Sequence, residues 1–155
     1  MTSIPALLSL LAHAERERNA AMSEAKRIEL EHRNALRQAE QLQTYRHDYE
    51  QRWSSHFSRS EGIAIVQCYQ GFVTRLGQAI EAQQRVTLQT AQRLERAQAA
   101  WQEQELRVAS VRKLIERRGL ELRCADARRE QKQLDEHAAR ALWGRVAGAG
   151  IASPP

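Results

Sequence analysis

The long stretch without proline is the feature of this sequence that most constrains its fold. Prolines stand only at positions 5, 154 and 155, so 148 consecutive residues contain nothing that must break a helix. The chain is rich in Ala, Arg, Gln, Glu and Leu, which are strong helix formers, whereas aromatic residues make up only 5%. This combination disfavours a globular core and is typical of a coiled coil or another long helix.

A heptad pattern runs through the first third of the chain. Ser3 suits the N-cap position and Pro5 suits a first turn, so we expect a helix from about residue 4 to 56. Alternating steps of four and three predict a coiled-coil seam in which Arg18, His32 and Arg46 cost stability and fix the register. Eleven of its fourteen positions are apolar: Leu7, Leu11, Ala14, Arg18, Ala21, Ala25, Ile28, His32, Ala35, Ala39, Leu42, Arg46, Tyr49 and Trp53.

A serine-rich break at 54–62 separates this pattern from a second one. Ser58 followed by Glu61 is typical of a capping box, so a second helix is expected over about 59–143. A polar patch at 83–90, with Val86 and Leu88 out of phase, predicts a stutter in the repeat. Thirteen of the eighteen seam positions are apolar: Val66, Tyr69, Val73, Leu76, Ile80, Gln83, Thr87, Thr90, Leu94, Ala97, Trp101, Gln104, Val108, Val111, Ile115, Arg118, Leu122 and Ala125.

These patterns predict an all-α fold: a two-helix antiparallel coiled-coil hairpin whose second helix is the longer. The hairpin forms a single domain over residues 1–143, and the glycine-containing residues 144–155 form a flexible tail. A fold near residue 59 places residue i opposite about residue 118 − i, so Leu7 lies near Val111. Residues 119–143, roughly 37 Å of helix, then extend beyond the first helix. Three leucines of this overhang lack an intramolecular partner: Leu120, Leu122 and Leu134.

Charge and composition exclude several classes of function. The formal charge is +5, but acidic and basic residues are interspersed, which favours a solvated helix surface over a nucleic-acid footprint. Cys68 and Cys124 are far apart and are expected to be free thiols in a reducing compartment. The apolar residues 4–12 lack a preceding basic segment, so they do not form a signal peptide, and no run reaches the length of a membrane span. We expect a cytosolic protein, with peripheral membrane association as an option.

The sequence contains no pattern that indicates catalysis. Its five histidines never occur at metal-ligand spacing, and Gly71 and Gly77 lack the spacing and the lysine of a phosphate-binding loop. A two-helix coiled coil also has no cleft that could enclose a substrate. We therefore expect a non-enzyme with no cofactor, no bound metal and no small-molecule substrate.

Two sets of residues resemble motifs of the flagellar type III export protein FliJ family. The chain also resembles this family in its length and in its expected coiled-coil hairpin. The C-terminal signature consists of Glu130, Gln131, Lys132, Asp135, Glu136, Ala138 and Arg140. The second set matches the positions with which the family docks on the export gate: Gln38, Leu42, Tyr45, Tyr49, Phe72, Leu76, Ala79 and Gln83.

The resemblance implies a role in bacterial flagellum biogenesis and motility. A protein of this family would act in the cytoplasm, peripherally at the inner membrane of the flagellar base. It would couple the export ATPase to the membrane export gate, in the manner of the stalk of a rotary ATPase, and escort export chaperones.

The residues themselves refine the expected gate-docking surface. Leu42, Tyr49 and Leu76 also lie on the seams and are expected in the core, whereas Tyr45 and Phe72 lie off the seams and are expected as exposed contacts.

Three other interpretations remain open at this point. The chain is compatible with a basic coiled coil that binds nucleic acid or an anionic membrane surface, whose affinity would fall steeply with salt. It is also compatible with a dimer of long helices, although the serine-rich break favours the hairpin. The equivalent stalk protein of a virulence type III secretion system shares the architecture, and the C-terminal signature favours the flagellar version.

Overall fold

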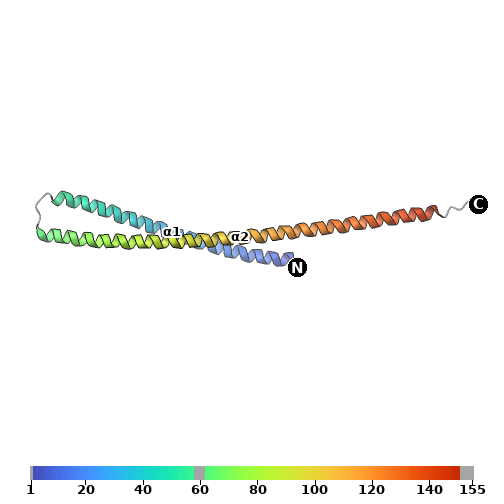
Figure 1. Cartoon of the computed structure of the whole chain (residues 1–155), viewed down its shortest axis with the longest axis horizontal. Helices are drawn as coiled ribbons and strands as arrows, with labels where there is room; N and C mark the ends of the chain where they lie inside the picture. The colour runs from blue at the N-terminus through green and yellow to red at the C-terminus, as the bar shows by residue number, and fades with distance from the viewer. Residues whose placement is uncertain (1, 58–61, 151–155) are drawn as a thin grey trace, which may run out of the picture. The chain divides into compact units, whose positions relative to one another are not determined.

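The computed structural model describes residues 2–57 and 62–150, and within them it contains two helices and no strand. Helix α1 spans Ile4–Phe57 and helix α2 spans Ile63–Ala149 (Figure 1). At the start of α1 the Ser3 hydroxyl accepts a hydrogen bond from the Ala6 N–H at 3.4 Å, and the Ser3 carbonyl accepts one from Leu7. Ser3 is therefore the N-cap of α1. The two helices confirm the expected all-α fold with a longer second helix.

The seam positions predicted from the heptad pattern are the positions that the helices bury. All fourteen of the α1 positions are buried or half-buried, as are seventeen of the eighteen α2 positions, the exception being Leu122 at 40% exposed. The heptad pattern therefore locates the contact between the helices correctly. The fully buried apolar residues are Leu7, Ala14, Ala25, Ile28, Ala35, Leu76, Ile80, Val108 and Val111.

The expected stutter at 83–90 is wrong. Thr90 is only 7% exposed and Gln83 and Thr87 are half-buried, whereas the apolar Val86 and Leu88 point to solvent. The heptad spacing thus continues through this segment without a change of phase. Polar side chains stay on the seam here because they find hydrogen-bond partners across it, as described for Gln83 and Thr90 below.

The described helices form two compact units, residues 14–107 and residues 2–13 with 108–150. In the first, the Gln83 Nε2 donates to the Ala35 carbonyl at 2.9 Å, and the rings of Tyr49 and Tyr69 lie 5.6 Å apart. Both pairs agree with the expected antiparallel register.

Other pairs of the same unit lie five or six residues, about one and a half turns, further along α2 than expected. Arg93 pairs with Glu31 at 3.0 Å, and Arg18 lies 3.9 Å from Glu105. Each seam residue packs between two residues on the opposite helix, so a register inferred from sequence is uncertain by about one turn. In the unit of residues 2–13 and 108–150, α2 continues past the start of α1 (Figure 1). Leu7 lines a groove with Leu114 in this unit.

The ends of α2 differ from the expected limits. The predicted capping box of Ser58 and Glu61 lies outside the described residues, and α2 begins after Gly62, whose carbonyl accepts from the Ile65 N–H. At the other end α2 continues to Ala149, six residues beyond the expected end. Glycine inside a helix costs only about 1 kcal/mol relative to alanine, so glycines alone do not end α2. Residues 144–149, which were expected to belong to a flexible tail, are therefore helical in the structure.

Candidate protein-docking surfaces

An aromatic cluster joins α1 and α2 in the unit of residues 14–107. The ring of Tyr49 lies at its centre, 4.3 Å from the ring of Phe72 and 5.6 Å from that of Tyr69. Trp53 packs on Tyr69 at 4.8 Å, and Tyr45 meets Phe72 edge-on at 6.1 Å. These five residues, five of the eight aromatic residues in the chain, are called the aromatic cluster below. Aromatic pairs at these distances add about 0.5–1.5 kcal/mol each beyond the burial of area.

Tyr45 is the most exposed member of the aromatic cluster. Its side chain is 52% exposed, whereas the other four rings are half-buried. Tyr45 also lines a shallow groove between the helices, called the Tyr45 groove below, with Gln38, Gln41, Leu42 and Gln83. A large aromatic ring beside a groove with amide groups is typical of a protein-binding hot spot.

The structure brings most of the eight predicted docking residues together. Gln38, Leu42, Tyr45 and Gln83 line the Tyr45 groove, and Tyr49 and Phe72 adjoin it through the ring of Tyr45. Leu76 is 7% exposed and belongs to the core, as the seam indicated. Ala79 is exposed and lines no described groove.

Two details differ from the expected division between core and contact residues. Phe72 is not a freely exposed ring, because it is half-buried against Tyr49. Sequence reasoning also did not include Trp53 and Tyr69 in the site. Both lie on the predicted seams, one on each side of the break between the helices. This shared position next to the break is the feature of the sequence from which their contact could have been predicted.

The second surface is the C-terminal signature, which lies on the part of α2 beyond the start of α1. Every described residue from 126 to 150 is exposed, so all seven signature residues face solvent. The Gln131 Nε2 donates to the Asp135 Oδ1 at 3.1 Å, and Arg129 lies 3.9 Å from Asp126. These contacts are local to one helix, so the signature side chains remain accessible to a partner. A shallow notch beside them is lined by Gln133, Glu136, His137 and Arg140.

The charged surface of the first unit contains a small network around Arg27. The Arg27 guanidinium hydrogen-bonds Glu24 and Glu31, and Arg93 reaches the same Glu31 from α2. The hydrogen bond from Arg27 lowers the pKa of Glu24, and the same bond raises the pKa of Arg27. Such exposed pairs hold the register weakly and perform no chemistry.

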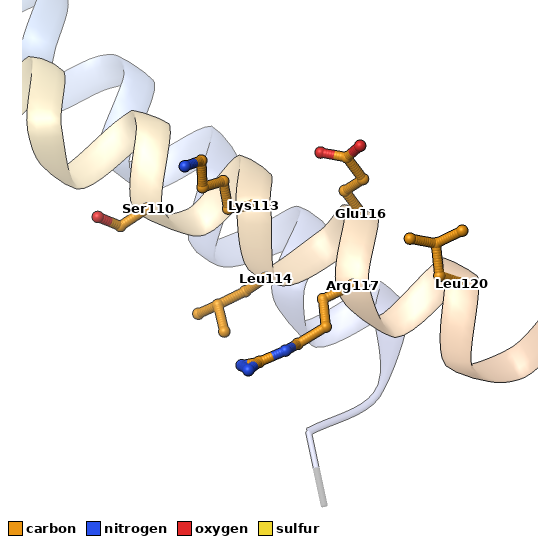
Figure 2. Close-up of a pocket in the computed structure, with 6 residues that line it drawn as sticks. All are labelled: Ser110, Lys113, Leu114, Glu116, Arg117 and Leu120. Carbon is orange, nitrogen blue, oxygen red and sulfur yellow. The ribbon is translucent and has the colours of Figure 1, made fainter.

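The remaining surface features of the described residues offer no catalytic arrangement. Figure 2 shows a depression on α2 whose lining residues all come from this one helix, with Leu114 and Arg117 on one side and Glu116 and Leu120 on the other. Side chains that diverge in this way do not enclose a ligand. Cys68 and Cys124 are free thiols, and the described residues hold no group of three metal-ligating side chains.

Neither helix, over its described residues, has a segment long and apolar enough to cross a membrane. The fold is a coiled-coil hairpin with two exposed surfaces along its helices, the Tyr45 groove and the C-terminal signature.

Comparison with known proteins agrees with this class. Residues 3–147 match the family described as "Flagellar FliJ protein". The chain is also 30% identical over 140 residues to the flagellar FliJ protein of Salmonella typhi, covering 88% of this chain and 92% of that protein. The chain therefore belongs to the flagellar FliJ family, and it is a non-enzymatic component related to flagellar protein export.

Proposed function

We propose that this protein couples the export ATPase of the flagellar type III apparatus to the membrane export gate. In this proposal the protein acts in the cytoplasm, held peripherally at the inner membrane through the gate, and it escorts export chaperones. The observation that carries the proposal is the Tyr45 groove, because it gathers Gln38, Leu42, Tyr45 and Gln83 into one accessible surface.

The Tyr45 groove has the chemistry of a gate-docking surface. Tyr45 is half exposed beside the amides of Gln38, Gln41 and Gln83, so a partner can bury the ring and bond the amides in the same contact. Because the surface carries no cluster of charge, docking there should tolerate moderate salt better than binding through a basic surface would.

Replacement of Tyr45 tests the gate contact more cleanly than replacement of Phe72. Phe72 also packs on Tyr49 at 4.3 Å, so Phe72→Ala would disturb the aromatic cluster as well as the surface. Tyr45→Ala should weaken binding to the purified cytoplasmic part of the export gate by at least about tenfold, measured by calorimetry, and leave helicity nearly unchanged. Leu30→Ala is a matched control, because Leu30 is 57% exposed on the same helix and lines no described groove. Equal affinities for Tyr45→Ala and the parent would remove this surface from the proposal.

The C-terminal signature is the proposed contact with the ATPase. Its residues are all exposed, as is every described residue after Ala125, and residues 126–150 hold five Lys or Arg and four Asp or Glu. Such a helix is free to enter a cavity or ring formed by another protein. ATP hydrolysis by the purified export ATPase should therefore rise when the full chain is added, and this rise should be lost when the chain ends at Gly119.

The two contacts can be separated experimentally. Tyr45→Ala should stimulate the ATPase as the parent does, while the shortened chain should still bind the gate, because the Tyr45 groove lies entirely within residues 14–107. If neither chain stimulates hydrolysis while binding to DNA falls steeply with salt, the coupling role is wrong and a basic coiled coil is the better description.

A further inference from the structure

The last three turns of α2 form an amphipathic segment that extends nine residues beyond the C-terminal signature, with which it shares Ala138 and Arg140. At about 100° per residue, six apolar residues of this segment share one arc of about 140° on the helix surface. They are Ala138, Ala139, Leu142, Trp143, Val146 and Ala149. The three large residues are 64%, 75% and 61% exposed for Leu142, Trp143 and Val146, so the chain itself does not cover this face.

Positive charge flanks this apolar face. On the same helical projection, Arg145 lies about 20° beyond one edge of the arc and Arg140 about 60° beyond the other. Residues 137–150 contain no Asp or Glu. Of the net charge of +5, residues 137–150 contribute +2 through Arg140 and Arg145, residues 107–125 contribute +4, and residues 126–136 contribute −1, whereas residues 1–106 hold thirteen basic and thirteen acidic residues.

From this arrangement we propose that residues 138–149 bind the surface of an anionic phospholipid bilayer. A helix with Trp and Leu on one face and arginines at its edges lies in the plane of the headgroups, with the apolar face inserted and the guanidinium groups at the phosphates. Trp143 sits at one edge of the apolar arc, where an indole reaches the boundary between acyl chains and headgroups. The two arginines favour an acidic surface over a neutral apolar groove, and the position of Trp143 at the edge of the apolar arc favours lipid over an acid-rich protein groove.

The contact is interfacial, and it is separate from docking on the export gate. The segment is about 18 Å long, which is far shorter than a membrane span. Its binding free energy would come from a few apolar side chains and two arginines, so the contact is reversible and sensitive to salt.

Flotation of the full chain with lipid vesicles tests the proposal. The chain should bind vesicles of phosphatidylcholine and phosphatidylglycerol in a 3:1 ratio, and it should bind pure phosphatidylcholine vesicles at least about tenfold less. Leu142→Ser should lower binding to the mixed vesicles by about tenfold. Leu134→Ser is the matched control, because Leu134 is 63% exposed on the same helix but lies outside the apolar arc, and it should leave binding unchanged.

A paired charge exchange separates a defined site from general attraction. Arg140→Gln with Arg145→Gln should lower binding by about fivefold for each arginine. Arg123→Gln with Arg128→Gln removes the same charge from the same helix and should have a clearly smaller effect. Equal losses in the two double variants would overturn the proposal in favour of nonspecific adsorption.

Fluorescence gives a readout of insertion. Brominated acyl chains in the mixed vesicles should quench part of the tryptophan emission, and Trp143→Phe should abolish this quenching while retaining most of the binding. If the parent chain does not float with the mixed vesicles, or floats without quenching, the apolar face does not insert into lipid. A protein partner would then be the occupant of this face, and the proposal would be wrong.

Discussion

Two polar residues of the seam, His32 and Gln83, are hydrogen-bonded across it, and these pairs define how the helices align. The His32 Nδ1 lies 3.0 Å from the Thr90 Oγ1, and the Gln83 Nε2 donates to the Ala35 carbonyl. A slip of one helix by a heptad would leave these groups half-buried without partners, at a cost of about 1–3 kcal/mol each. Polar seam residues therefore select one register, although apolar residues at the same positions would bind the helices more tightly.

Replacing both His32 and Thr90 should show that this pair fixes the register of the helices and lowers their stability. Thr90→Val alone should lower the free energy of unfolding by about 1 kcal/mol, because the ring of His32 loses its partner. His32→Leu combined with Thr90→Val should recover the loss, because the seam becomes continuously apolar. Urea denaturation followed by circular dichroism measures both. Thr74→Val is the control, because the Thr74 hydroxyl bonds only the Gln70 carbonyl of its own helix. A double variant less stable than either single variant would contradict this account.

The pair of Glu24 and Arg27 predicts a local effect of pH. The hydrogen bond from Arg27 lowers the pKa of Glu24, so its contribution to stability is present at neutral pH and is lost as pH falls through the pKa of the folded state. Because Glu24 is fully exposed, the effect on global stability should be very small. Arg27→Ala should raise the pKa of Glu24 in an NMR titration of its carboxyl carbon. Arg33→Ala, which removes the partner of Glu29 instead, should not change it. Equal changes in both variants would assign the effect to general charge.

For single residues, the sequence predicts which positions are buried better than it predicts which residues contact each other. The seam residues followed from a spacing of 3.5, which needs only local information. The partner of a polar seam residue depends on the register, and Arg18 meets Glu105, five residues beyond the residue expected from the fold at residue 59. In the same way, Trp53 and Tyr69 were placed on the correct faces, but their contact with each other depends on how the chain turns between the helices.

Among the elements, α2 carries glycines that its own packing does not require. A Cβ atom added at Gly71 or Gly77 would meet no atom within 4 Å apart from its chain neighbours and its own helix backbone. Each glycine nevertheless lowers helix stability, because glycine has the greatest backbone freedom in the unfolded chain and loses it in the helix. Gly71 and Gly77 flank Phe72 and Leu76. A partner protein that approaches the helix backbone closely at this point would explain why glycine occurs at both positions.

Gly71→Ala and Gly77→Ala should each raise the free energy of unfolding by about 0.5–1 kcal/mol. Thermal denaturation of the single variants measures this gain. Gly119→Ala provides a control, because it too has open space around the added Cβ but lies far along α2 from the aromatic cluster. If the gate contacts the backbone at these glycines, Gly71→Ala should weaken gate binding although it stabilises the helix. A destabilised Gly71→Ala chain would mean that the space around this residue is not open.

The end of α2 shows where helix prediction from sequence fails. Gly144 and Gly148 suggested a frayed tail, but α2 continues to Ala149 because five alanines between residues 138 and 149, together with Leu142, favour the helix around these glycines. The competing terms are each about 1 kcal/mol or less, so local patterns do not decide such a boundary. The amphipathic face of residues 138–149 exists only because the helix continues, and it was therefore missed.

Across the whole molecule, packing and charge change at different points along α2. The buried seam residues end with Val111, and the described residues after Ala125 are all exposed. Residues 107–125 hold six basic and two acidic residues, whereas residues 126–150 hold five basic and four acidic ones. The most basic stretch therefore still packs on the rest of the chain, and the exposed end of α2 is nearly neutral. A helix held only by its own hydrogen bonds opens far more readily than one packed on another helix.

Amide hydrogen exchange followed by mass spectrometry should display this division. Peptides from residues 126–149 should exchange at least about tenfold faster than peptides from the seam of residues 14–107, because their helix opens locally. Addition of the export ATPase should slow exchange over residues 130–140, whereas mixed anionic vesicles should slow it over residues 138–149 and leave residues 130–137 unchanged. The chain ending at Gly119 serves as the control, because it should keep the slow exchange of the seam. Uniform slow exchange along all of α2 in the free chain would show that the C-terminal helix is already covered, for example by a second copy of this chain, and both docking proposals for that helix would then need a different surface.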